Sequence, residues 1–260
     1  GTVRAMASLV ADAEAETGPG TVGIGMPGTI SPATGLVKNA NSTWLNGRPL
    51  RDDVIRALGR SVRLANDANC FALSEAVDGA GAGAKIVFGV IVGTGTGGAI
   101  VSDGRVLIGA NAIGGEWGHN PMPWPEPEEW PGPPCYCGRT GCIETFLSGP
   151  GMSREHAHVT GEQLDPSTIA ARAAAGDRGA ESTMVRYERR LARALASIIN
   201  VVDPDVVVLG GGLSNVSRLY ERVPSLWTRY VFSDRVVTRL MPARFGDSSG
   251  VRGAAWLSSP

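Results

Sequence analysis

Short runs of apolar residues, each ending in glycine or in a polar turn, alternate along the chain with segments of helical periodicity. Four of these runs predict buried strands: "TVGIGMPG" at 21–28, "VRLAND" at 62–67, "IVFGVIVGTGTGG" at 86–98 and "DVVVLGGG" at 205–212. Helices are predicted at 2–16, 51–58, 68–80, 181–202, 215–230 and 246–257. Strands that alternate with helices in this way are typical of an α/β protein.

Other segments lack helical periodicity. "AIVSDGRVLIG" at 99–109 predicts a hairpin that turns at Asp103-Gly104, and the polar segment 29–50 is too rich in turn residues for a helix. Residues 110–150 are predicted to be irregular. Their proline-rich middle resembles a linker, but a linker would not normally hold half of a metal site, so we interpret the region as a substrate loop.

Composition excludes several classes of partner. The 24 basic and 25 acidic residues create no field that would favour nucleic acid or an anionic membrane. No apolar run reaches the length of a membrane helix. Three of the four cysteines are clustered, which fits a reducing compartment better than a disulfide framework. We therefore expect a cytoplasmic protein that binds neither membrane nor nucleic acid.

The cysteine cluster "CYCGRTGC" lies at 135–142, downstream of a single histidine at 119. Cysteines one residue apart rarely form a disulfide, whereas three thiolates and one imidazole complete a tetrahedral zinc shell. The sequence predicts a structural zinc site at His119, Cys135, Cys137 and Cys142. The alternative is a reduced cluster that forms a turn without metal. Cys70 lies in an apolar run and is predicted to be a buried core residue.

Two glycine-rich segments follow predicted strands. "GTGTGG" at 93–98 leads into another strand, so it fits neither a dinucleotide-binding fingerprint nor a P-loop, both of which precede a helix. Such a loop can still offer backbone N–H groups and a threonine hydroxyl to phosphate oxygens. "GGG" at 210–212 could admit an adenine ring or could allow tight packing.

Several polar residues are candidates for binding or catalysis. Asp67, with Asn66 before it, ends an apolar strand and could accept a proton from a substrate hydroxyl, or could cap the helix that follows. Glu116 and His119 are three residues apart and could share one ligand. Glu144 follows the last cysteine by two residues, so a metal would hold it near the same place.

Together these motifs resemble the ROK family of bacterial sugar kinases and sugar-responsive repressors. "LANDANC", "VGTGTGG", "GEWGHNP", "CYCGRTGCIET" and "VVVLGGGLSN" match its motifs in order over nearly the whole chain. "KNANSTWLNG" and "GEWGHNPMPW" are most similar to the fructokinase (mannofructokinase) branch, with N-acetylglucosamine kinases second. The resemblance implies a two-domain actin-like (ribonuclease H-like) α/β sugar kinase fold, usually assembled as a homodimer, which uses ATP and Mg²⁺.

The resemblance also implies a division of the chain. Residues 1–85 would form an incomplete N-terminal domain, completed by the C-terminal helix 248–260, and residues 86–247 a second domain with the zinc-bound substrate loop 110–150. Family members begin with a "D-x-G-G-T" hairpin that binds phosphates and Mg²⁺. This sequence lacks that motif, and its first half begins on a helix, so we expect that the N-terminal hairpin is missing and that this chain turns over slowly.

Roles follow from the resemblance for each matching residue. Asp67 would be the general base in the phosphorylation of a hexose, with fructose to fructose 6-phosphate as the first expectation. One set would bind the sugar: Pro27, Gly28, Asn41, Asn66, Glu116, His119 and Glu144. Another would bind the nucleotide: Gly93, Thr94, Gly95, Thr96, Gly97, Gly211 and Gly212. Zinc on one nitrogen of His119 would orient the other nitrogen toward the sugar.

Other functions remain open on the sequence alone. The kinase could act on N-acetylglucosamine or another hexose. The protein could instead be a sugar-binding ROK transcriptional repressor with an upstream helix-turn-helix, or a zinc-stabilised binding protein without activity. Asp67, the intact "GTGTGG" and the balanced charge favour a kinase. Trp44, Trp117 and Trp124 could stack on a sugar, although packing is the commoner role of tryptophan.

Overall fold

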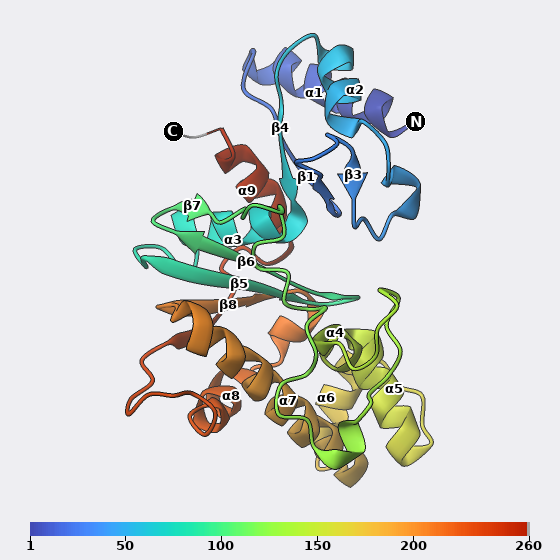
Figure 1. Ribbon diagram of the computed structural model, residues 1–260, viewed down its shortest axis with the longest axis vertical. Coiled ribbons are helices and arrows are strands. Elements are labelled where there is room, and N and C mark those ends of the chain that lie inside the picture. The colour runs from blue at the N-terminus through green and yellow to red at the C-terminus, as the bar shows by residue number, and fades with distance from the viewer. Residues whose placement is uncertain (259–260) are drawn as a thin grey trace.

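Two blocks of secondary structure lie one above the other in the computed structural model, which describes residues 1–258 (Figure 1). The helices are α1 (Thr2–Thr17), α2 (Leu50–Leu58), α3 (Asp67–Val77), α4 (Ile143–Leu147), α5 (Gly149–Thr160), α6 (Pro166–Ala174), α7 (Arg178–Val202), α8 (Leu219–Trp227) and α9 (Ser249–Trp256). The strands are β1 (Gly23–Met26), β2 (Thr29–Ile30), β3 (Val37–Lys38), β4 (Arg63–Asn66), β5 (Ile86–Val92), β6 (Thr96–Ser102), β7 (Arg105–Val106), β8 (Val206–Gly210) and β9 (Arg239–Pro242).

A five-stranded sheet forms the centre of the larger block, in the order β7-β6-β5-β8-β9. β5 pairs in parallel with β8 and antiparallel with β6. Helices lie against both faces of this sheet, which explains why β5 and β8 are almost continuously apolar. The predicted hairpin is confirmed, because β6 and β7 pair around Asp103 and Gly104, both with positive φ as a type I′ turn requires.

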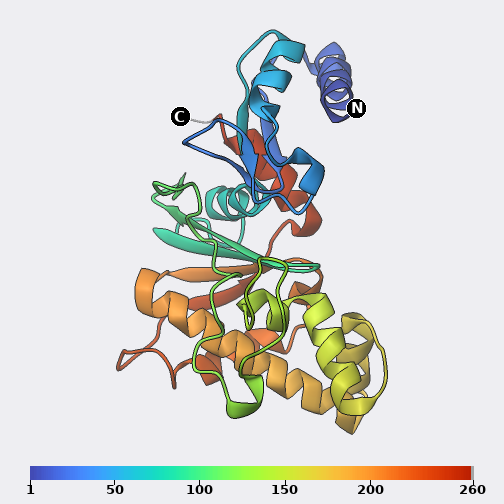
Figure 2. The ribbon, with the colours of Figure 1, turned by 45° about the vertical axis from the view of Figure 1, so that its right-hand side comes forward.

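The upper face of this sheet is covered by α3, and α9 lies against α3 (Figure 2). The two helices approach so closely that a Cβ at Gly253 would overlap the carbonyl oxygen of Cys70, which requires glycine at that position. Cys70 is fully buried at this contact, as predicted. The C-terminal helix thus returns to the first half of the chain. Residues 259 and 260 of the predicted segment 248–260 lie outside the described residues.

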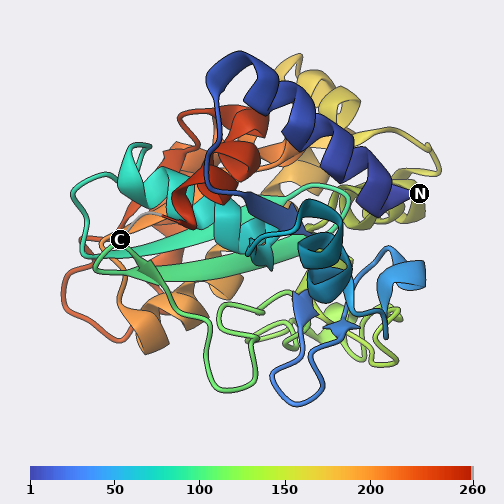
Figure 3. The same cartoon turned by 90° about the horizontal axis from the view of Figure 1, so that it is seen from above.

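The smaller block is built on the parallel pair β1–β4, whose register places Met26 opposite Asn66. The ends of both strands therefore lie side by side, which positions the segments that follow them. Seen from above, α1, β1 and α9 are neighbours (Figure 3), and they enclose a cavity of about 610 Å³. No residue of α1 is buried. Two expectations stay predictions: that an opening hairpin is missing, and that a domain boundary follows residue 85.

Several elements differ from those predicted. The region 110–150 is not wholly irregular, because α4 and the first residues of α5 lie in it. α5, α6 and β9 were not predicted, since each is short and has little apolar periodicity. Side-chain caps at Ser148 and Asp165, which accept hydrogen bonds from the first-turn N–H groups of α5 and α6, were the available signal. α7 begins at Arg178 rather than at 181, and α8 covers only 219–227 of the predicted 215–230.

α7 is the longest helix among residues 1–258, with 25 residues, and runs under the sheet (Figure 1). It carries arginines and glutamates along its length. Within the same described part of the chain, no helix is both long enough and apolar enough to cross a membrane.

A buried ion cluster joins α7 to the proline-rich part of the loop. The carboxylate of Glu129 accepts a hydrogen bond from Arg190 Nε at 2.7 Å, and Arg193 NH2 lies 2.7 Å from each of its oxygens. All three side chains are almost fully buried. Burial by itself raises the pKa of Glu129, but the hydrogen bonds from Arg193 and Arg190 outweigh it and hold this pKa below its ordinary value. The cluster therefore anchors the loop to a rigid helix through buried, paired charges.

We expect Glu129→Gln to destabilise the protein by about 3–5 kcal/mol, because it removes the nearest and most buried countercharge of two buried guanidinium groups. Glu126→Gln is the matched control. Glu126 lies 3.9 Å from Arg193 but is 44% exposed, so its loss should cost less than about 1 kcal/mol. Denaturant unfolding of both variants measures the difference, and equal effects would show that the buried cluster does not stabilise the loop.

Candidate functional site

A cavity of about 270 Å³ opens where the two blocks meet. It contains Asp67 and all seven residues predicted to bind the sugar. Five parts of the chain contribute to it: the turn after β1, the segment after β3, the β4–α3 junction, the β5–β6 loop with the ends of its strands, and the region 110–150. The lining residues are Pro27, Gly28, Asn41, Asn66, Asp67, Ala68, Ile91, Thr94, Gly95, Thr96, Gly97, Gly98, Glu116, His119, Tyr136 and Glu144.

Asp67 is the first residue of α3, and its neighbour Asn66 is the residue that caps this helix. The Asn66 side chain accepts a hydrogen bond from Ala68 N at 2.9 Å and donates one to the carbonyl of Gly28 at 3.1 Å. Asp67 also accepts a bond from Ala68 N, at 2.9 Å. Since Asn66 already serves as the cap, the Asp67 carboxylate is available to the cavity.

The surroundings of Asp67 change its acidity. Asp67 is exposed and lines both this cavity and the cavity beside α1, yet the protein around it displaces enough water to raise its pKa above the ordinary value. Hydrogen bonds from Ala68 and Asn66 offset part of this rise. A carboxylate with a raised pKa is a stronger proton acceptor than an ordinary aspartate.

The other two carboxylates are held by the segments around them. Glu144 Oε2 accepts a hydrogen bond from Thr96 N at 2.9 Å, which ties it to the β5–β6 loop. Glu116 has a raised pKa, mainly because the protein displaces water around it. Together with Asp67 they give the cavity three carboxylates, which can accept hydrogen bonds from the hydroxyl groups of a polyol.

The segment "GEWGH" is fixed to the sheet next to the cavity. Trp117 is buried, packs edge-on against Phe88 with ring centres 5.6 Å apart, and donates from Nε1 to the carbonyl of Gly97 at 3.0 Å. This tryptophan therefore has a packing role. Lys38 Nζ, on β3, donates to the carbonyl of Asn111 at 2.7 Å and links the smaller block to the same region.

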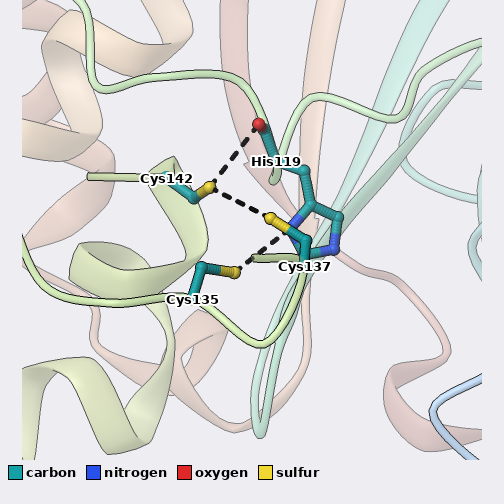
Figure 4. Close-up of side chains that lie close together, drawn as sticks. All are labelled: His119, Cys135, Cys137 and Cys142. Carbon is teal, nitrogen blue, oxygen red and sulfur yellow. Dashed lines mark hydrogen bonds between the residues drawn. The ribbon is translucent and has the colours of Figure 1, made fainter. Parts of the chain in front are cut away.

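The predicted metal ligands lie together beside the cavity (Figure 4). The ligand atoms of His119, Cys135, Cys137 and Cys142 all lie within 4.8 Å of one another. Cys137 Sγ is 3.6 Å from Cys142 Sγ, and Cys135 Sγ is 3.5 Å from His119 Nδ1. These sulfurs are too far apart for a disulfide. Zinc with Zn–S bonds of about 2.3 Å places tetrahedral sulfurs roughly 3.8 Å apart, so the four residues fit a zinc ion.

Backbone hydrogen bonds shape the turn that presents the cysteines. Cys135 N donates to the carbonyl of Arg139 at 2.8 Å, and Gly138 N donates to the carbonyl of Cys135 at 3.0 Å. Gly138 and Gly141 both have positive φ, a backbone conformation that glycine adopts at little cost. Cys142 immediately precedes α4, so the cluster also fixes the helix that carries Glu144.

The second ring nitrogen of His119 does not stand free in the cavity. Its Nε2 lies 3.0 Å from the hydroxyl of Tyr136, a residue that also lines the cavity. Tyr136 was not among the site residues predicted from the sequence, although it stands between two predicted metal ligands. The three tryptophans proposed for stacking are absent from the lining: Trp44, Trp117 and Trp124.

A second cavity, of about 970 Å³, lies on the other side of the β5–β6 loop. Gly93, Thr94 and Gly212 line it, and Thr94 lines both cavities. Of the residues predicted to bind the nucleotide, Gly95, Thr96 and Gly97 line only the smaller cavity.

Gly211 lines neither cavity. Its φ is positive, and a Cβ there would press against the carbonyl of Val92, so tight packing explains this glycine. Residues of α5, α6 and the segment before α8 complete the wall of the larger cavity, and the sequence offered no signal for them.

Known proteins share the sequence pattern and the fold of this chain. The profile of the ROK family matches residues 1–259. The N-acetyl-D-glucosamine kinase of Photobacterium profundum is 44% identical over 243 residues, which cover 92% of this chain and 80% of that protein. The crystal structure of the ROK hexokinase from Thermus thermophilus has a TM-score of 0.85 and 34% identity, over 97% of this chain and 84% of that one.

A further solved structure was determined with both ligands bound. It is the ROK family glucokinase from Streptomyces griseus in complex with glucose and AMPPNP. Its TM-score is 0.79 and its identity 27%, over 98% of this chain and 86% of that one.

We expect the purified protein to contain one zinc ion per chain, because three thiolates and one imidazole form a closed tetrahedral shell. Cys137→Ser removes one thiolate and should lower the zinc content. Cys70→Ala is the control, since Cys70 is buried away from the cluster and should not affect it. Elemental analysis without added metal measures all three proteins, and a wild-type content near zero would refute the site.

Proposed function

The chain belongs to the ROK family and has its actin-like sugar kinase fold, and from this premise we propose that it transfers the γ-phosphoryl group of ATP to a hydroxyl of N-acetylglucosamine. The observation that carries the proposal is the pair of neighbouring cavities that share Thr94 as a lining residue. The smaller holds three carboxylates and suits a sugar. The larger suits a nucleotide, and a glycine-rich loop separates the two.

Phosphoryl transfer needs mainly positioning and neutralisation of charge. The backbone N–H groups of Thr94 and Gly95 bind phosphate oxygens at the boundary between the cavities. Those of Gly93 and Thr96 already donate within the protein, to the carbonyl of Gly95 and to Glu144. A phosphoryl group there lies next to the sugar, within reach of a hydroxyl in the smaller cavity. We expect Mg²⁺ to accompany ATP, as it does in phosphoryl transfer generally.

Asp67 acts as the general base. Its carboxylate accepts the proton of the attacking sugar hydroxyl as the new O–P bond forms, and the bond from phosphorus to the ADP oxygen breaks. The raised pKa strengthens this acceptor. Asn66 holds the start of α3 against Gly28, so the carboxylate keeps a fixed place in the cavity.

Glu116 and Glu144 accept hydrogen bonds from the remaining sugar hydroxyls. Glu144 is fixed on both sides, by Thr96 N and by the cysteine cluster that precedes α4. Zinc, when bound to this cluster, supplies charge that orients His119; its four protein ligands fill the shell and leave no position for a catalytic water.

The choice of sugar differs from the first expectation. The similarity to N-acetyl-D-glucosamine kinases supports the alternative drawn from the sequence and does not support fructose. The place of Asp67 in the smaller cavity and the nucleotide-sized second cavity favour a kinase over a repressor. A homodimer and a cytoplasmic location stay predictions.

A panel of hexoses tests the substrate. Release of ADP is measured with ATP and each of N-acetylglucosamine, fructose, glucose and mannose. We expect the highest kcat/KM for N-acetylglucosamine. A preference for fructose would restore the first expectation, and sugar binding without turnover on any hexose would favour a sugar-binding regulator.

Replacement of the base tests the mechanism. We expect Asp67→Asn to lower kcat by roughly 10²–10⁴-fold while the sugar Kd changes little, because only the proton acceptor is lost. In the wild type, kcat/KM should fall on the acid side at a pH above 3.8, since the pKa of Asp67 is raised and its protonated form cannot act as a base. Asp103→Asn, in the exposed β6–β7 turn, is the control. Near-normal turnover of Asp67→Asn would exclude this role.

A further inference from the structure

Tyr136 occupies an unusual place at the mouth of the smaller cavity. It is the second residue of the turn from Cys135 to Gly138, so predicted metal ligands flank it on both sides. Its side chain is 73% exposed, although the residue lines the cavity that holds Asp67, Glu116 and Glu144. Little protein covers the ring, so packing does not explain its position.

The contact that orients Tyr136 is with His119. The hydroxyl lies 3.0 Å from His119 Nε2, and the two rings meet edge to face with centres 5.0 Å apart and planes at 89°. The opposite nitrogen, Nδ1, faces Cys135 Sγ at 3.5 Å (Figure 4). The histidine therefore connects the cysteine cluster on one side with a tyrosine hydroxyl on the other.

The hydrogen-bonding capacity of the two groups determines the direction of this contact. A neutral imidazole that binds a metal through Nδ1 carries its proton on Nε2, so His119 donates and the Tyr136 oxygen accepts. The tyrosine hydroxyl then retains one proton to donate. Acceptors on the cavity side are the oxygens of a bound substrate and the carboxylates of Glu116 and Glu144.

We propose that Tyr136 contacts the sugar directly, with its hydroxyl accepting a hydrogen bond from His119 Nε2 and donating one to a sugar oxygen. The cysteine cluster then positions the Tyr136 hydroxyl in two ways, through the backbone turn that carries Tyr136 and through the ring of His119, which donates to it. Because the turn is held on both sides, only the side-chain rotation of Tyr136 must be fixed when the sugar binds. The inference rests on the proposed function, since it assumes that the smaller cavity binds a sugar.

Tyr136→Phe tests the inference because it keeps the ring and removes only the hydroxyl. One hydrogen bond contributes about 0.5–1.5 kcal/mol, so the sugar Kd should rise roughly 2–12-fold. Zinc content and the Kd of a non-hydrolysable ATP analogue should not change. Tyr230→Phe is the matched control, because Tyr230 packs on Trp124 and lines neither cavity. Calorimetry with the hexose that the wild type prefers measures each variant.

The outcomes separate this inference from the proposed function. A sugar Kd that is unchanged in Tyr136→Phe overturns the inference. A tighter Kd overturns it too, since it would show that the hydroxyl competes with the sugar for His119. Equal weakening toward sugar and nucleotide would reveal a general structural effect and would also overturn it. If the wild type binds no hexose at all, the proposed function itself fails.

Discussion

The packing of α3 between the five-stranded sheet and α9 is the contact on which the rest of the structure depends. α3 begins at Asp67 in the smaller block and lies across the sheet of the larger block. Its close approach to α9, at Gly253 and Cys70, ties the C-terminal helix to the first half of the chain. This contact brings Asp67, at the start of α3, close to the glycine-rich loop, so that both line the smaller cavity.

The region 110–150 reaches the cavity from the opposite side and is held at two independent points. One is the cluster of three cysteines and His119, beside the cavity. The other is the buried ion cluster of Glu129 with Arg190 and Arg193, on the long helix α7. A segment so rich in proline and glycine forms little regular structure of its own, and without anchors conformational entropy would favour many loop conformations over the one that lines the cavity. Long-range anchors replace the missing secondary structure.

Three carboxylates line the smaller cavity, and the proximity of their negative charges is unfavourable for folding. The pKa values of Asp67 and Glu116 are both raised, which means that the protein disfavours their ionised forms. For Asp67 the raised pKa is also what makes the group an effective base, so the same loss of water that opposes the charge serves the proposed reaction. The pKa of Glu129 is shifted in the opposite direction. Two arginines stabilise its ionised form and lower its pKa, and Glu129 does not line the smaller cavity.

Much of the fold and of the site could be predicted from the sequence because the signals are local. The strand β5 with its glycine-rich loop, the Asp103-Gly104 turn and the spacing of Cys135, Cys137 and Cys142 each lie within a few residues, so local geometry alone constrains them. Only the tertiary structure decided the rest. The partners of Glu129 are more than 60 residues away in the chain, α5 and α6 are helical mainly through caps and packing, and Tyr136 meets His119 across 17 residues. Contacts between distant residues form only when the whole chain folds, because no local preference of either residue specifies its partner.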